Sequence, residues 1–226
     1  MSSDFFKFPS TPHLATLSGV DVRGDKVMSD SERTDFLNHA LTIEEKMDGA
    51  NLGISFDSDG NIKVQNRGAY LFQLDTGQWK HLDQWLESKM ETLFEVLADQ
   101  FILFGEWCFA RHSVFYHRLP DWFLGFDIYD KKAKQFLSTV RRGTVLDSSR
   151  ITQVPVVGHG RFRFEDLVGL LSTSKFSQQQ AEGLYLRADG DDWLLQRAKL
   201  VRPAFVQSMV RHWSRTGIIP NRRAKT

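Results

Sequence analysis

The sequence predicts an α+β fold of antiparallel sheets with flanking helices, and three observations support this class. The composition of the 226 residues, 41% hydrophobic and 25% charged, is that of a globular protein and excludes disordered, collagen-like and coiled-coil chains. One long segment has apolar residues at helical spacing. Two pairs of short apolar segments flank turn sequences, which is typical of β-hairpins and therefore of antiparallel sheets.

The first hairpin is predicted from two strands, 51–56 and 62–67, that flank the turn sequence 57–61. A slip of one residue would mix apolar and polar side chains on each face, so the apolar residues select the register. The facing apolar pairs are Phe56 with Ile62 and Ile54 with Val64. The other face is polar and places Asn51 opposite Arg67, so we expect it to line a cleft.

The segment 81–99 is predicted to form the longest helix and to pack on a sheet through one apolar stripe. The stripe consists of Leu82, Trp85, Leu86, Met90, Leu93, Phe94 and Leu97. Buried strands are expected next, at 101–106 and 122–129. The first of these strands ends in Glu106, which must face a cleft or find a partner, because an unpaired buried charge is unfavourable.

Three shorter helices are expected, at 138–149, 164–173 and 204–216. The last of them lies between a proline and a glycine, which favour the start and the end of a helix. No repeat, low-complexity block or long linker divides the chain. We therefore expect one large domain followed by a short C-terminal helix and tail.

A second hairpin is predicted to join 183–187 to 193–201 through the turn sequence 188–192. Its register is less well defined than that of the first hairpin. Several loops bring Glu182 close to the position opposite Lys199, so an acid and a base would meet there. A functional pair and a purely structural ion pair both explain this arrangement.

The sequence also predicts where the protein works. No apolar run approaches the roughly 18 residues of a membrane span. The N-terminal sequence has an acid at Asp4 and no apolar core, so it is not a secretory signal. The single cysteine, Cys108, excludes an internal disulfide framework and a cysteine-based zinc cluster, and is expected to be a small buried residue. We expect no membrane partner and a reducing, cytoplasmic setting.

Positive charge is concentrated near the C-terminus. Eight of the 29 Lys and Arg residues, and no acid, lie in 196–226, which leaves 21 cations against 28 acids elsewhere. A basic end on an acidic body favours a polyanionic partner, while a solvated, frayed tail is the alternative for the last residues. The segment 109–118 mixes cations with aromatic residues. We expect a surface loop there, or a loop that reaches nucleic acid or a 5′-phosphate.

The sequence Lys46-Met47-Asp48-Gly49 lies just before the first hairpin and resembles the Lys-x-Asp-Gly motif of the covalent nucleotidyltransferases. This short pattern is weak alone, because it recurs by chance. Five further segments resemble the remaining motifs of that superfamily, in the same order. They are Asn66-Arg67-Gly68, Phe104-Gly105-Glu106-Trp107, Phe123-Leu124-Gly125-Phe126-Asp127, Glu182-Gly183-Leu184-Tyr185-Leu186-Arg187 and Arg197-Ala198-Lys199-Leu200.

Within the superfamily the chain most resembles the RNA ligase 2 family, on three features. Glu45 directly precedes Lys46, Asn51 follows Lys46 at the spacing of the family, and Phe126-Asp127-Ile128-Tyr129 follows the glutamate motif. The resemblance covers roughly residues 8–205. Arg197 departs from it, because the family usually has lysine there and a planar guanidinium differs from a point charge.

The resemblance implies an ATP-grasp-like nucleotidyltransferase (adenylyltransferase) domain at 1–203 and a short helix with a basic tail at 204–226. Ligases of this family normally carry a second domain after the last motif, whereas only about 25 residues follow it here. We therefore expect no C-terminal OB-type domain. A protein partner that supplies its function is one possible consequence.

The resemblance makes Lys46 the nucleophile that becomes lysyl-AMP. An ordinary lysine, with a pKa of about 10.4, is about 0.04% neutral at pH 7, a handicap of roughly 4.6 kcal/mol. We therefore expect burial and nearby cations, two arginines, a lysine and magnesium, to depress the pKa of Lys46. Asp48 is expected to orient the nucleophile or to reach a metal-bound water.

The resemblance also implies how the nucleotide is held. Glu45 would contact the adenine edge and Glu106 would accept a hydrogen bond from a ribose hydroxyl. Phe126 would stack on the adenine, with Phe123 as the alternative, because the two residues have opposite parity on a regular strand and one of them belongs to the core.

The remaining roles concern phosphate and metal. Asn51 and Arg67 would bind phosphate oxygens, and Arg197 and Lys199 would neutralise the α-phosphate and the leaving group. Glu182 would hold the divalent ion, Mg²⁺ or Mn²⁺, a hard cation suited to carboxylate oxygen. Such a cluster of charges suits phosphoryl-type transfer, which depends on positioning and electrostatics.

The predicted function is an ATP-dependent RNA ligase that takes AMP onto Lys46, transfers it to an RNA 5′-phosphate and seals that end to a 3′-hydroxyl. One alternative is a DNA ligase or a GTP-using capping enzyme. Another is a non-catalytic module that binds nucleotides or RNA ends. A third is a chain that adenylylates itself and relies on a partner to seal.

Overall fold

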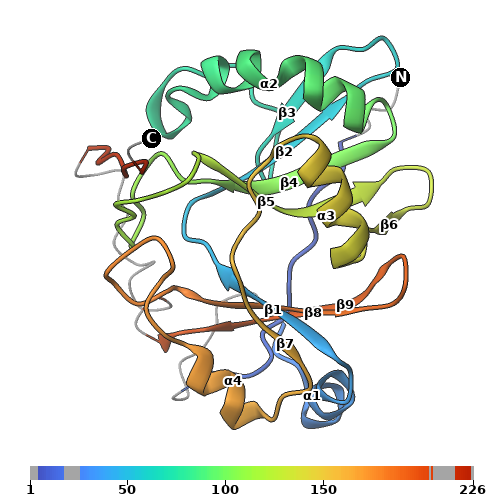
Figure 1. Cartoon of the computed structure of the whole chain (residues 1–226), viewed down its shortest axis with the longest axis vertical. Coiled ribbons are helices and arrows are strands. Elements are labelled where there is room, and N and C mark those ends of the chain that lie inside the picture. Colours follow the sequence, from blue (N-terminus) through green and yellow to red (C-terminus); the bar gives the residue numbers. More distant parts are fainter. Residues whose placement is uncertain (1–4, 18–25, 204, 206–216, 225–226) are drawn as a thin grey trace.

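Two antiparallel sheets form the centre of this computed structural model, which describes residues 5–17, 26–203, 205 and 217–224. The five-stranded sheet has the order β3 (Ile62–Gln65), β2 (Ala50–Phe56), β4 (Phe101–Trp107), β5 (Phe123–Asp130) and β6 (Gln135–Phe136). The four-stranded sheet has the order β7 (Val156–Gly160), β1 (Leu41–Lys46), β8 (Gly183–Asp189) and β9 (Leu194–Val201). Figure 1 shows one sheet above the other. The predicted α+β class with antiparallel sheets is confirmed.

Helices flank both sheets (Figure 1). They are α1 (Asp30–Leu37), α2 (Leu82–Leu97), α3 (Thr139–Ser148) and α4 (Phe164–Leu170). The chain crosses from the four-stranded to the five-stranded sheet between β1 and β2, and returns after α3. The predicted lysine motif therefore lies where the chain passes from one sheet to the other.

The apolar stripe of α2 packs on the five-stranded sheet, as predicted. Leu86 and Leu93 are buried in the same core as Leu52 of β2. The helix is shorter than expected at both ends, because His81 and Ala98 have positive φ angles of 68° and 39°, outside the helical region.

Of the two helices under the four-stranded sheet, α4 was predicted and α1 was not. Phe36 of α1 and Leu167 of α4 share a buried core with Leu186 of β8. The sequence did not predict α1, because it has only one buried apolar side chain and therefore no stripe. It begins at a capping box, in which the Ser29 side chain accepts from the Glu32 backbone N–H.

Both predicted helices after β6 are present. Ser138 caps α3 by accepting a hydrogen bond from the backbone of Arg141, so the helix occupies the expected 138–149 segment. α4 ends at Leu170, three residues earlier than expected, because Leu171 has a non-helical ψ of 85°. The helix expected at 204–216 falls outside the described residues except for Phe205.

The first hairpin has the predicted apolar register, with Ile54 opposite Val64. The expected pairing of Asn51 with Arg67 is wrong. β3 ends at Gln65, because a turn begins at Asn66. The Asn66 side chain accepts hydrogen bonds from the backbone N–H groups of Gly68 and Ala69. On its other side β2 pairs with β4, where Asn51 lies opposite Glu106.

The structure defines the register of the second hairpin, which the sequence left open. β8 and β9 continue to Asp189 and Leu194, so their loop is shorter than the predicted 188–192 turn. Lys199 consequently lies opposite Tyr185, and the carbonyl of Glu182 accepts from the backbone of Arg202. The expected placement of Glu182 next to the position opposite Lys199 is therefore wrong.

A buried ion pair joins β1 to α3. Glu44 and Arg142 are both 0% exposed, and Nη1 and Nη2 of Arg142 donate to the two carboxylate oxygens of Glu44. Arg142 also donates to the carbonyl of Phe126 on β5. The guanidinium thus ties β1 of one sheet to β5 of the other.

Replacing Arg142 with methionine is expected to destabilise the protein by about 3–5 kcal/mol, because Glu44 is left buried without its partner. Replacing the pair together, Arg142→Met with Glu44→Leu, is expected to cost less, since no unpaired charge remains. Urea unfolding of both variants measures the difference. Equal losses in the single and double variants would contradict this account.

Candidate active site

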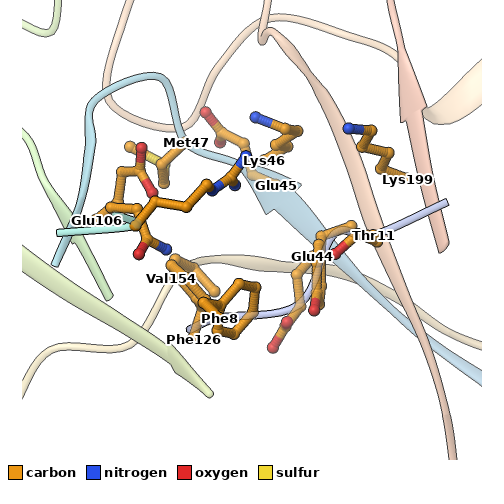
Figure 2. A pocket seen from close by; sticks show the side chains of 13 residues that line it. Phe8, Thr11, Glu44, Glu45, Lys46, Met47, Glu106, Phe126, Val154 and Lys199 are labelled. Carbon is orange, nitrogen blue, oxygen red and sulfur yellow. The ribbon is translucent and has the colours of Figure 1, made fainter. Parts of the chain in front are cut away.

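A pocket between the two sheets collects most of the predicted site residues (Figure 2). Its walls come from β1, β8 and β9 of one sheet and β2, β4 and β5 of the other. It is lined by Phe8, Thr11, Glu44, Glu45, Lys46, Met47, Asn51, Arg67, Glu106, Phe126, Val154, Tyr185 and Lys199. Of the residues that the sequence singled out, Asp48, Glu182 and Arg197 lie outside this lining.

Lys46 is the last residue of β1 and lies opposite Gly183, the first residue of β8. Its Nζ is 2.7 Å from Oε2 of Glu182. The structure therefore pairs the predicted nucleophile directly with the predicted metal-binding carboxylate, although the two are 136 positions apart in the chain.

The electrostatic surroundings of Lys46 differ from those expected. Burial lowers the pKa of Lys46, but the carboxylates of Glu182, Glu106 and Asp48 act in the opposite direction, and the net pKa is raised. Within the chain the charges nearest the amine are acids, and the expected contribution of magnesium to a depressed pKa stays a prediction. Lys46 rests as an ammonium ion held by Glu182.

Two of these carboxylates, those of Glu106 and Glu182, have raised pKa values. Burial raises the pKa of Glu106 to about 7, and the nearby Glu182 adds to this effect. Burial also raises the pKa of Glu182, against the pull of Lys46. Carboxylates crowded in this way favour a cation between them.

Replacing Glu106 with glutamine is expected to stabilise the nucleotide-free, metal-free protein by about 1 kcal/mol at pH 8 and by less at pH 5. Because the pKa of Glu106 is raised to about 7, the folded state holds a proton that the unfolded state releases, and stability falls as the pH rises toward 8. The glutamine oxygen can still accept from Gly49 N, now 3.1 Å from Oε1. Thermal midpoints at both pH values test this, and equal gains at the two would contradict it.

Gly49, which ends the Lys-x-Asp-Gly motif, has a steric reason to be glycine. A Cβ at this position would lie 2.6 Å from the Trp107 carbonyl oxygen and 3.1 Å from the Glu106 side chain. The close approach lets the Gly49 N–H reach Glu106. The glycine therefore allows the lysine-bearing turn to pack against β4.

Asp48 is held by the loop that follows β4. Its Oδ2 accepts from the backbone N–H groups of Ser113 and Val114 at 2.6 and 2.7 Å. Its own N–H donates to the hydroxyl of Tyr116 at 2.8 Å. The 109–118 segment, predicted as a surface loop or a nucleic-acid contact, therefore also fixes the residue two positions after the nucleophile.

The two phenylalanines of the predicted stacking motif face different environments. Phe126 is partly exposed and lines the pocket, where the ring of Phe8 meets it edge to face at 5.4 Å. Phe123 is fully buried and packs against Trp85 of α2. Of the two alternatives, only Phe126 is accessible to a ligand in this pocket.

Glu45 and Asn51 present polar groups to the pocket. Glu45 is 3% exposed and accepts from the Ser174 hydroxyl and from the Lys175 N–H, and burial raises its pKa. Two of the roughly four lone-pair sites of a carboxylate remain for a ligand. Oδ1 of Asn51 is buried without a hydrogen-bond partner among the described residues. Such an orphan is unfavourable, so a ligand that supplies its partner would be stabilised here.

Arg197 is not brought into the pocket. Its guanidinium forms an ion pair with Asp127 at 3.1 Å and stacks on the rings of Phe8 and Phe136 at 4.5 and 4.4 Å. Asp127 is fully buried and also pairs with Arg187. Arg197 thus anchors the strand that carries Phe126, while its predicted contact with a phosphate stays a prediction.

Phe8 and Thr11 are pocket residues that the sequence did not reveal. They belong to an N-terminal segment that forms no strand or helix, so no periodicity marks them. Figure 2 shows Phe8 and Phe126 on one side of the pocket and the amines of Lys46 and Lys199 on another. An aromatic end and a cationic end match the base and the phosphates of a nucleotide.

In the described part of the chain, no three His, Cys, Asp or Glu side chains form a cluster that could hold a metal ion alone. A Mg²⁺ site of one or two carboxylates completed by substrate phosphates needs no such cluster. Glu182, beside Glu106, offers the hard oxygen ligands of that kind of site. None of the described helices has the length and apolar character that a membrane crossing requires.

Comparison with known proteins agrees with this arrangement. A family model described as RNA ligase matches residues 39–201. Among curated proteins, none matches the sequence significantly. Solved structures with a similar fold include RNA ligase from Naegleria gruberi, as a variant with ATP and Mn (19% identity, TM-score 0.62, 77% of this chain and 53% of that chain) and with PPi (20% identity, TM-score 0.61, 76% and 52%). This chain spans about half the length of those proteins.

Proposed function

The chain belongs to the RNA ligase family, and we propose that it is an ATP-dependent RNA ligase that works through a lysyl-AMP intermediate. The observation that carries this proposal is the position of Lys46, whose amine lies at the cationic end of the pocket, 2.7 Å from Glu182. The known Naegleria structures with ATP and with PPi support ATP as the nucleotide.

The pocket residues suit ATP along its whole length. Phe126 and Phe8 provide an aromatic wall for the adenine, and Glu45 provides an acceptor for its amino group. Glu106 and the unpartnered Oδ1 of Asn51 provide acceptors for the ribose hydroxyls, and the side-chain N–H groups of Asn51 provide donors for an adjoining phosphate. Arg67 and Lys199 provide positive charge for the phosphates. We propose these roles on the basis of pocket position and chemical type.

We propose that Glu182 holds a divalent cation, Mg²⁺ or Mn²⁺, together with oxygens of the ATP phosphates. When bound, such a cation neutralises charge on the transferring phosphate and the leaving group. The raised pKa values of Glu182 and Glu106 fit this role, because burial disfavours both negative charges and a cation between them would offset that cost.

In the first step the Lys46 amine attacks the α-phosphorus of ATP. A nitrogen–phosphorus bond forms and the bond to pyrophosphate breaks. The amine must first lose the proton that its raised pKa retains, so breaking the contact with Glu182 is part of activation. Positioning by the surrounding residues and electrostatic stabilisation then account for catalysis.

We further propose that AMP passes from Lys46 to an RNA 5′-phosphate, and that a 3′-hydroxyl displaces it to seal the strand. These later steps need contacts with RNA, and the match to this chain covers only 53% and 52% of the Naegleria proteins. Sealing that depends on a protein partner is the second candidate.

The deciding experiment is the intact mass of the protein after incubation with Mg²⁺ or Mn²⁺ and either ATP or GTP. We expect a gain of one AMP with ATP and no change with GTP. A gain of GMP alone would favour a capping-type enzyme, and no gain from protein free of AMP would favour a binding module. Nicked and single-stranded RNA and DNA substrates then separate an RNA ligase from a DNA ligase. Transfer of AMP to RNA without sealing would favour a partner.

A further inference from the structure

The segment 217–224 packs against the loop that holds Asp48. We call residues 108–119 the Asp48 loop. The Arg111 N–H donates to the Ile219 carbonyl at 2.8 Å, and the Leu119 N–H donates to the Arg222 carbonyl at 2.9 Å. The Arg222 N–H donates back to Tyr116 at 2.8 Å. The segment is thus paired with the loop along its length, and residues 221–224 are not a frayed tail.

Asn221 is the centre of this contact. It is 3% exposed, and its Oδ1 accepts from the Tyr116 N–H at 2.9 Å. Its Nδ2 donates to the carbonyls of Cys108 at 2.8 Å and Ala110 at 3.3 Å. Its own N–H donates to Phe109 at 2.8 Å. The Asn221 carboxamide therefore provides partners for three buried backbone groups of the Asp48 loop, two carbonyls near its start and one N–H group near its end.

The same loop fixes Asp48. Between the groups bound by Asn221 lie the N–H groups of Ser113 and Val114, which bind the Asp48 carboxylate. Tyr116, whose N–H is held by Asn221, uses its fully buried hydroxyl to accept from the Asp48 N–H. Asp48 follows Lys46 by two residues. A displacement of the loop would therefore move the turn that aims the amine into the pocket.

We propose that Asn221 is a positioning residue for the adenylylation of Lys46. It acts through the Asp48 loop and touches neither the nucleotide nor the amine. The inference rests on the proposed function. Without the carboxamide, three backbone groups lose their partners and the loop loses its fixed shape. The turn containing Asp48 then holds Lys46 less well, while the residues that line the nucleotide pocket stay in place.

The first test compares Asn221→Ala with Arg223→Ala, an exposed change in the same segment. A small misplacement of a reacting group lowers the rate by roughly tenfold to a hundredfold. We expect a loss of this size in the Asn221→Ala adenylylation rate at saturating ATP, with an unchanged half-saturating ATP concentration. Arg223→Ala should match the wild type. Asn221→Ser, which keeps a hydroxyl near the Tyr116 N–H, replaces the alanine variant if that variant does not fold.

The second test asks whether Asn221 acts through the loop. Tyr116→Phe removes the hydroxyl that binds Asp48, and we expect the double variant with Asn221→Ala to lose less activity than the product of the single losses. Independent effects, or a wild-type rate in folded Asn221→Ala, would overturn the inference. If the wild type itself takes no AMP, the proposed function fails and this inference fails with it.

Discussion

Replacing Lys46 with alanine is expected to abolish the covalent attachment of AMP. Lys46 is the one residue that supplies the nucleophile in the proposed reaction, so no partial activity should remain in the first step. Intact mass after incubation with ATP and Mg²⁺ is the measurement. The matched control is Lys63→Ala, because Lys63 lies on β3 in an exposed ion pair with Asp57 and outside the nucleotide pocket.

The fold should survive this change. Lys46 is 27% exposed at the side chain, and its loss leaves Glu182 with a raised pKa that can take up a proton. We therefore expect a thermal midpoint close to that of the wild type. If the alanine variant still gained AMP, peptide mapping would locate the modified residue. Lys199, the other lysine in the pocket lining, would then be the first candidate nucleophile.

The pH dependence of the wild type follows from the same contact. Acidic neighbours raise the pKa of Lys46, so the neutral amine is scarce at pH 7. The rate of adenylylation should therefore rise with pH from 6 to 9. A rate that is flat over this range would mean that ATP and the metal depress the pKa of Lys46 fully before reaction.

The elements predicted correctly are those that local sequence determines. The stripe of α2 and the apolar register of β2 with β3 follow from periodicity. β1 was not predicted, because its two glutamates are buried against partners distant in sequence rather than placed on a solvent face. Glu44 pairs with Arg142, and Glu45 accepts from Ser174. A strand with adjacent buried charges does not show the alternation of a half-buried strand.

The site residues also differ in whether local sequence or contacts with distant residues determine their positions. Motif residues on strands of different sheets, such as Lys46 on β1 and Glu106 on β4, reach one pocket because the two sheets face each other there. Arg197 is in the motif but pairs with Asp127, and nothing local in the sequence indicates that choice. Phe8 and Asn221 come from segments without periodic structure, so only the folded chain identifies them.

Replacing Glu182 with glutamine is expected to lower the adenylylation rate by about a thousandfold, a loss typical of removing one essential electrostatic contact in a transition state. The change keeps the size of the side chain and an oxygen that can accept from Lys46. It removes the negative charge that we propose holds the divalent cation. The measurement is the rate over a range of Mg²⁺ and Mn²⁺ concentrations, with Glu165→Gln as an exposed control on α4.

The same variant separates a metal ligand from a simple ion-pair partner, because the two roles predict opposite changes. Glu182 raises the pKa of Lys46, so removing its charge leaves more neutral amine at pH 7. If Glu182 only restrained the lysine, Glu182→Gln would react as fast as the wild type or faster. The increase of its rate with pH would then begin at a lower pH than in the wild type. A large loss that higher metal concentration partly restores requires the carboxylate in the reaction itself. A loss accompanied by unfolding would instead identify Glu182 as a structural residue.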